Sequence, residues 1–177
     1  MRLFVAVWPS ASVSELLRDR LPAQTEDLSW VAPDAWHVTL AFLGEVAQAA
    51  APELIQALSV VGSELPPTTA SIGPETRRLG SSVLCVPVEG LGALAHSVRA
   101  VAGPFGRWGG LDPEMPFFGH LTVARARRHQ GVAEPLVGRS VYGRWEVAEF
   151  RVVSSVLGRS GSRYEPLGIL QLTGRAP

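Results

Sequence analysis

The chain has 177 residues, of which 46% are hydrophobic and 18% are charged, and its 16 arginines balance 16 acidic side chains. This composition is typical of a soluble globular protein, and the zero net charge argues against a protein that coats nucleic acid. No apolar run is long enough to span a membrane, no cleavage-site pattern follows the first residues, and the single Cys85 excludes a disulfide within the chain, so we expect a cytoplasmic protein.

Charge is distributed unevenly between the two halves. Residues 1–88 carry 5 Arg and 9 acidic side chains, whereas residues 89–177 carry 11 Arg and 7 acidic side chains. The positive second half is compatible with an anionic ligand on that side of the molecule.

Hydrophobic periodicity predicts strands and helices in turn through the first half of the chain. A strand is favoured where apolar residues alternate or run together, and a helix where they recur at three- and four-residue spacing. The predicted elements are a strand over 2–8, a helix that begins after Pro9 and Ser10, an extended segment over 28–31, a strand over 36–43 that ends at Gly44, and a helix that begins near Pro52.

The second half continues with more strands than helices. The pattern predicts strands near 68–73, 76–80 and 82–88, a helix over 91–102, a Gly- and Pro-rich loop over 103–117, a strand over 117–125, an Arg-rich turn over 127–131, a short helix over 132–137, and long strands over 141–157 and 163–172. This order predicts an α+β fold in which residues 1–177 form a single domain of two interlocked lobes around a cleft.

Two copies of one short pattern stand out, His37-Val38-Thr39-Leu40 and His120-Leu121-Thr122-Val123, each inside a predicted strand. Side chains of a strand alternate between two faces, so each histidine shares a face with the threonine two positions later. Apolar neighbours, among them Phe42 in the first strand, are then expected on the opposite face. Two such pairs across a cleft would hold a phosphate between two imidazoles.

This arrangement suits in-line displacement at phosphorus, which needs a base on the side of the nucleophile and an acid on the side of the leaving group. Histidine fits both tasks because its unperturbed pKa is about 6.5. Threonine hydroxyls and an arginine would stabilise charge on the remaining phosphate oxygens. No cluster of His, Cys, Asp and Glu has metal-ligand spacing, so we expect neither a metal nor a cofactor.

Arginines after the second motif present a geometric difficulty. Arg125 lies five positions after His120, so strict alternation points it to the opposite face unless the strand ends or bulges near Ala124. Arg128 has the right parity but lies further into the turn. His96, within a predicted helix, and His129, in a polar turn, are not expected to take part in catalysis.

These segments resemble a known family over nearly the whole chain. The similarity lies in residues 2–7, in Trp30-Val31, in Trp36-His37-Val38-Thr39-Leu40-Ala41-Phe42-Leu43-Gly44-Glu45, in Phe118-Gly119-His120-Leu121-Thr122-Val123-Ala124-Arg125-Ala126-Arg127, and in residues 161–167. The chain is similar to the two-histidine (2H) phosphoesterases, and among them to the RNA 2′,3′-cyclic phosphodiesterases, also called 2′-5′ RNA ligases.

The resemblance implies two pseudo-symmetric lobes, each an antiparallel sheet with outer helices, and opening of 2′,3′-cyclic phosphates at RNA ends to leave a 2′-phosphate. By position, His37 matches the proton donor to the departing 3′ oxygen, and His120 matches the base that activates water. Thr39 and Thr122 match the phosphate-binding hydroxyls, and Arg125 matches an arginine near the phosphate. RNA ends or nucleotides with a cyclic phosphate are the implied partners, without a membrane, and we expect a monomer.

One position departs from the family pattern. Relatives often have proline directly before the second histidine, where this chain has Gly119, and we expect the freer glycine backbone to loosen the aim of His120. The sequence also leaves open which aromatic side chain stacks on a nucleobase, with Phe4, Trp8, Trp30 and Trp108 as candidates.

Alternative functions remain within the same chemistry. The chain could act on a small cyclic nucleotide or an ADP-ribose derivative, or join RNA by reversal of hydrolysis. A protein that binds RNA ends without turnover is disfavoured, because binding alone would tolerate the loss of one histidine.

Overall fold

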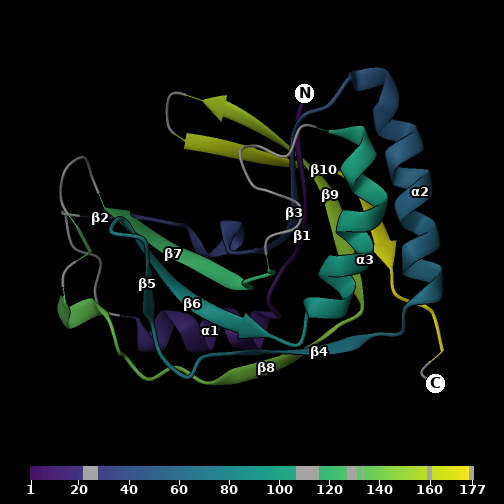
Figure 1. The fold of residues 1–177 in the computed structure, drawn as a ribbon. Coiled ribbons are helices and arrows are strands. Elements are labelled where there is room, and N and C mark those ends of the chain that lie inside the picture. The colour runs from purple at the N-terminus through teal and green to yellow at the C-terminus, as the bar shows by residue number, and fades with distance from the viewer. Residues whose placement is uncertain (22–27, 107–115, 127–130, 133, 159–160, 176–177) are drawn as a thin grey trace.

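Two antiparallel sheets form the frame of the protein in a computed structural model that describes residues 1–21, 28–106, 116–126, 131–132, 134–158 and 161–175 (Figure 1). The first sheet has the strand order β10-β9-β1-β3. Its strands are β1 (Arg2–Val7), β3 (Val38–Glu45), β9 (Glu149–Gly158) and β10 (Gly161–Gln171).

The second sheet has the strand order β2-β7-β6-β4-β8, with β5 paired to β6 beside this path. Its strands are β2 (Leu28–Trp30), β4 (Thr68–Ile72), β5 (Arg77–Leu79), β6 (Val83–Glu89), β7 (His120–Ala126) and β8 (Gly143–Val147). Both sheets are antiparallel, as expected for the predicted α+β class.

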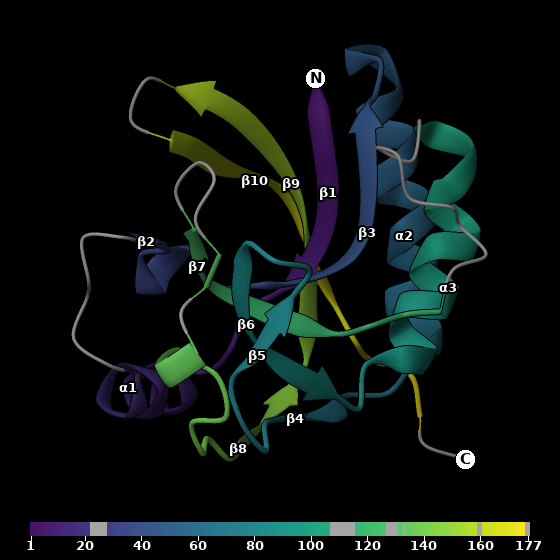
Figure 2. The ribbon, with the colours of Figure 1, turned by 60° about the vertical axis from the view of Figure 1, so that its left-hand side comes forward.

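Three α-helices are described, and two of them cross from one sheet to the other. α1 (Ala11–Arg20) follows β1 of the first sheet but contacts β8 of the second, and α3 (Gly92–Ala102) follows β6 of the second sheet but contacts β3 of the first. α2 (Ala51–Glu64) lies beside α3 and also contacts β10 (Figure 2). The crossings interlock the two halves of the chain.

Each helix buries the apolar face that its spacing predicts. The Ser10 side chain caps α1 by accepting a hydrogen bond from the Val13 amide at 3.3 Å. Burying each leucine of such a face contributes about 1.5–3 kcal/mol. Buried leucines of one core cluster come from both sheets and all three helices, among them Leu3, Leu17, Leu40, Leu54, Leu58, Leu84, Leu94 and Leu121.

Most predicted elements are confirmed with small shifts at their ends, but one is wrong. The strand expected over 141–157 is two strands, β8 and β9, which belong to different sheets and meet at Ala148. Its apolar residues serve both layers, because Trp145 and Val147 pack with the second sheet and Phe150 and Val152 with the first. Because apolar residues continue from β8 into β9, the hydrophobic pattern does not reveal that the chain passes from one sheet to the other.

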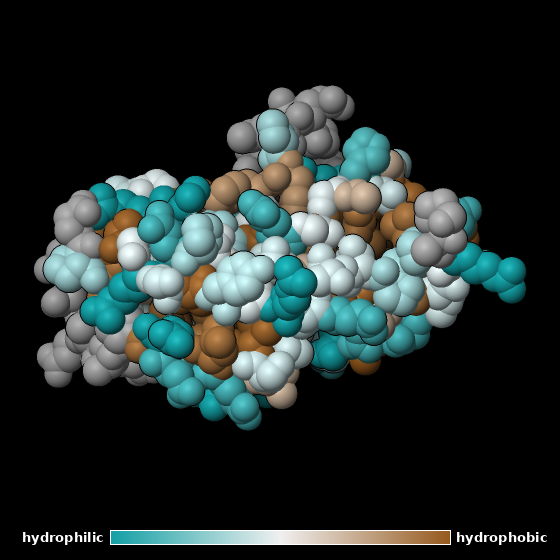
Figure 3. Space-filling model, turned by 90° about the horizontal axis from the view of Figure 1, so that it is seen from below, coloured by the Kyte–Doolittle hydropathy of each residue, from teal (hydrophilic) through white to brown (hydrophobic). Residues whose placement is uncertain are grey.

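The outer surface is mixed in character. The face on the side of β4 and β8 shows hydrophilic side chains with smaller hydrophobic areas between them (Figure 3). Among the described residues, no helix combines the length and the apolar character that crossing a membrane requires.

Candidate active site

A cavity of about 390 Å³ brings both His-x-Thr pairs together. Thr39 of β3 and His37, directly before β3, reach it from the side of the first sheet, and His120 and Thr122 of β7 reach it from the second. Its other lining residues are Arg2, Phe4, Val31, Ala35, Phe42, Arg125, Ser155 and Tyr164. All five residues that the sequence singled out for the site therefore line one cavity.

The two histidines are held in the same way. The Nδ1–H group of His37 donates to the carbonyl oxygen of Ala35 at 2.7 Å, and that of His120 donates to the carbonyl oxygen of Phe118 at 2.9 Å. Each acceptor lies two residues before its histidine. Because a carbonyl oxygen only accepts, each ring keeps its proton on Nδ1 and leaves Nε2 for proton exchange.

Their surroundings differ. Aromatic rings enclose His37, with centroid distances of 4.9 Å to Phe4, 5.3 Å to Trp8 and 5.2 Å to Tyr164. Burial lowers the pKa of His37 below 6.5, the nearby His120 and Arg125 lower it further, and the Ala35 hydrogen bond opposes them. The ring of His120 instead stacks on the exposed Phe118, at a centroid distance of 5.7 Å.

A β-bulge follows the threonine of each motif. In β3, Thr39 pairs with Ala6 and Ala41 pairs with Val5, so Leu40 is the extra residue. In β7, Thr122 pairs with Cys85 and Ala124 pairs with Leu84, so Val123 is extra. An extra residue reverses the alternation of the side chains that follow it.

The bulge in β7 resolves the difficulty with Arg125. Val123 and Ala124 are both fully buried, and Arg125 returns to the face of His120 and Thr122 and lines the cavity. The bulge lies at Val123, beside the Ala124 position that the sequence analysis required. Arg128 and His129 lie outside the described residues.

The bulge in β3 overturns the expectation for Phe42. Strict alternation placed Phe42 on the face opposite His37, but Leu40 and Ala41 are both buried and Phe42 lines the cavity. Val38 and Leu40 lie in the core as predicted. Phe42 and Arg125 thus occupy equivalent positions, each three residues after the threonine of its motif.

Gly119 is more constrained than expected. The Val88 amide donates to the Gly119 carbonyl at 2.8 Å, and a Cβ on Gly119 would collide with the Val88 carbonyl oxygen. Close approach to β6 therefore requires glycine at this position, and the same contact holds the backbone directly before His120. These two contacts limit the backbone freedom that the sequence analysis attributed to Gly119.

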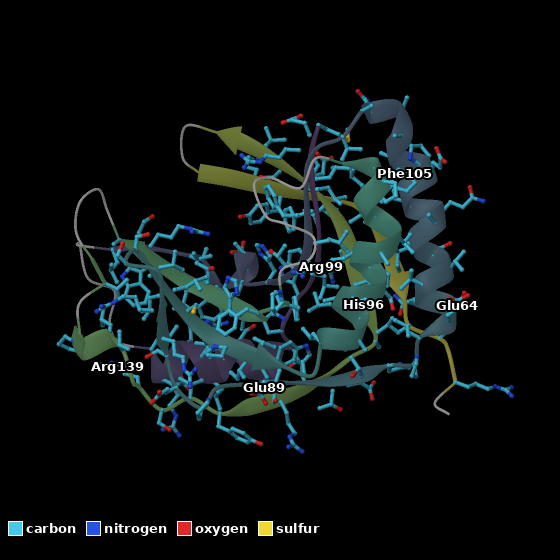
Figure 4. The ribbon with its side chains drawn as sticks, in the orientation of Figure 1. Glu64, Glu89, His96, Arg99, Phe105 and Arg139 are labelled. Atoms are coloured by element: carbon cyan, nitrogen blue, oxygen red, sulfur yellow. The ribbon has the colours of Figure 1, made fainter. Side chains whose placement is uncertain are left out.

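Arg99 of α3, labelled in Figure 4, connects the two motifs and was missed by sequence analysis. Its Nε donates to the carbonyl oxygen of Leu40, the bulged residue of β3, at 2.9 Å. Its guanidinium also lies 5.1 Å from the ring centre of Phe117, three residues before His120. His96 on the same helix is exposed and outside the cavity lining.

Other lining residues also escaped the sequence analysis. Ser155 and Tyr164 are cross-strand partners in the β9–β10 hairpin, and Arg2 lies at the start of β1. Of the aromatic candidates for a nucleobase, Phe4 lines the cavity and Trp108 lies outside the described residues. In the described part of the chain, no three His, Cys, Asp or Glu side chains converge as metal ligands would.

Comparison with known proteins relates this geometry to a class of phosphoesterases. A family model described as LigT like phosphoesterase matches residues 7–73. A curated relative from Escherichia coli (strain K12), named RNA 2′,3′-cyclic phosphodiesterase, is 33% identical over 149 residues, which cover 81% of this chain and 79% of the relative. The chain belongs to the LigT-like phosphoesterase family.

Solved structures share the fold. TT0787 of Thermus thermophilus superimposes with a TM-score of 0.82 at 26% identity, covering 99% of this chain and 100% of that one. Escherichia coli LigT complexed with 3′-AMP superimposes with a TM-score of 0.74 at 28% identity, covering 97% and 98%. These matches confirm the expected α+β fold.

Proposed function

We propose that this protein hydrolyses 2′,3′-cyclic phosphates at RNA ends to 2′-phosphates, with two histidines and no metal. The observation that carries the proposal is the single cavity in which both His-x-Thr pairs and Arg125 meet. The described residues that line it include two histidines and two arginines but no carboxylate, which favours an anionic ligand. The curated relative of the same family bears the matching name.

The proposed reaction is one in-line displacement. A water molecule attacks phosphorus opposite the 3′ oxygen, so a new P–O bond forms as the bond to the 3′ oxygen breaks, while the 2′ oxygen stays attached. His120 accepts the proton of the water through Nε2, and His37 donates a proton to the departing 3′ oxygen. Thr39, Thr122 and Arg125 stabilise charge on the non-bridging oxygens.

The enclosed position of His37 makes its donor role depend on the substrate. In the ligand-free cavity the lowered pKa favours the neutral ring, which cannot donate from Nε2. A bound phosphate places negative charge beside the ring and favours the imidazolium, so the substrate itself raises the pKa of its acid.

The test is hydrolysis in EDTA of a 2′,3′-cyclic mononucleotide and of an oligonucleotide with a cyclic-phosphate end, followed by identification of the product isomer. We expect turnover to survive chelation and to give only the 2′-phosphate. Activity that disappears in EDTA and returns with zinc or manganese would refute the mechanism. An ADP-ribose cyclic phosphate, offered in parallel, identifies the alternative substrate class if it is the faster one.

Histidine variants complete this test. Replacing His37 or His120 by alanine should each lower the rate by at least about 100-fold, because each loses one proton-transfer group. The double variant should be little slower than the slower single variant, since both act in one step. His96→Ala is the matched control, because this exposed histidine lies outside the cavity lining.

A further inference from the structure

The bulge of β7 brings Arg125 to the cavity, and the bulge of β3 brings Phe42 to it. Arg125 stands three residues after Thr122, and the equivalent position in β3 is Phe42. The guanidinium of Arg2 lies over the Phe42 ring at 5.1 Å from its centre. Phe42 therefore holds the cation of Arg2 against its ring, whereas in β7 the equivalent residue, Arg125, is itself the cation.

Arg2 is available to a ligand. It lines the cavity and is exposed, and within the described part of the chain no carboxylate pairs with it. Its cross-strand partner Glu45 contacts the Met1 amino group at 3.3 Å instead.

The proposed mechanism fixes the side on which the nucleoside lies. The departing 3′ oxygen belongs to the ribose and points to His37, so the ribose lies over the first sheet, on the side of Phe4 and Phe42. The 5′ oxygen of that ribose carries the next phosphodiester of an RNA chain. Among the described residues of this sheet, Arg2 is the cation that lines the cavity.

We propose that Arg2, held on the Phe42 ring, binds the phosphate on the 5′ side of the terminal nucleotide, so that the protein prefers cyclic-phosphate ends carrying a 5′ phosphate or phosphodiester to a bare nucleoside 2′,3′-cyclic phosphate. This inference rests on the proposed function. A planar guanidinium stacks on the ring and pairs with two phosphate oxygens at once, which an ammonium group cannot do.

The test compares adenosine 2′,3′-cyclic phosphate with its 5′-phosphorylated form and with a dinucleotide that ends in the cyclic phosphate. In the wild type, the added 5′ phosphate should raise kcat/KM about 10-fold, the scale of one charge-assisted contact. Arg2→Ala should remove most of this preference, and Arg2→Lys should restore only part of it. Arg144→Ala is the matched control, since this exposed arginine of β8 lies outside the cavity lining.

Outcomes separate this inference from the proposed function. A wild type that hydrolyses all three substrates with equal kcat/KM, or an Arg2→Ala variant that loses activity equally on all of them, overturns the role of Arg2 and leaves the hydrolase proposal standing. A wild type inactive on every substrate overturns both. If Arg2→Ala fails to fold, the wild-type comparison and Arg2→Lys decide, because the preference itself is the prediction.

Discussion

At the scale of single residues, the asymmetry between the two histidines organises the site. Both rings are tied through Nδ1 to a backbone carbonyl two residues earlier, so both offer Nε2. His37, in addition, is enclosed by three aromatic rings. Sequence analysis identified both residues but not this enclosure, because Trp8 and Tyr164 are brought to His37 by folding alone.

We expect the pKa of His37, followed by NMR titration, to lie below 6.5 in the free protein and to rise when inorganic phosphate is added. Burial raises the cost of the charged ring, whereas a bound anion compensates for it. His96, which is exposed on α3 and outside the cavity lining, is the internal control. A pKa of His37 that does not rise when phosphate is added would contradict its proposed role as the acid.

The same shift has a consequence for stability. Because the folded-state pKa of His37 lies below the unfolded value, the unfolded chain binds this proton more readily. Burial of neutral His37 therefore costs no free energy of unfolding above about pH 6.5. As the pH falls below this value and through the lowered pKa of His37, the free energy of unfolding decreases.

At the scale of elements, strand periodicity predicted the core-facing residues up to each bulge and failed beyond it. Val38, Leu40, Leu121 and Val123 are buried as expected. Phe42 was assigned to the wrong face because an extra residue in a strand is fixed by pairing with its neighbour, here β1, and leaves no mark in the hydrophobic pattern. The division of 141–157 between two sheets escaped for the same reason.

Arg99 donates a hydrogen bond to the bulged residue of β3, so replacing Arg99 should lower the catalytic rate. Replacement by methionine removes the hydrogen bond to the Leu40 carbonyl and the contact with Phe117, so both motif strands lose a shared support. We expect kcat to fall about 10-fold with KM changed much less, because a small misplacement of reacting groups is costly. Arg99→Lys, which keeps the charge, should recover only part of the rate.

The control for this variant is Arg18→Met, on the exposed side of α1. Arg99 acts as a positioning residue only if the pH profile of kcat shifts as well. Displacement of the motif strands would change the surroundings of the two histidines and therefore the pH dependence of kcat. A variant with reduced thermal stability but an unchanged kcat and pH profile would limit Arg99 to a structural role.

At the scale of the whole molecule, α1 and α3 each leave their own sheet and pack on the other. Neither sheet can therefore separate from the helices of its partner without exposing buried leucines such as Leu17 of α1. The alternating order of elements allowed the α+β class to be predicted. The exchange of helices could not be predicted, because an amphipathic face does not reveal which sheet will cover it.

We expect the two sheets to unfold together. Tryptophan fluorescence, which reports partly on the buried Trp36 and Trp145, and far-UV circular dichroism should give coincident urea transitions with one midpoint. Two separate transitions would show that the sheets are independent units. The catalytic rate, measured in the same urea series, should fall with that single transition, because the cavity takes residues from both sheets.

The difference between Phe42 and Arg125, which occupy equivalent positions, affects which histidine acts as the acid and which as the base. A cleft with identical halves would accept a nucleoside equally well over either sheet, and each imidazole would serve as acid in half of the bound complexes. At these two positions the halves differ, because Phe42 presents an aromatic ring that suits a ribose and a base, whereas Arg125 presents a cation that suits phosphate oxygens. We expect this difference, together with the aromatic rings around His37, to favour His37 as the acid and His120 as the base.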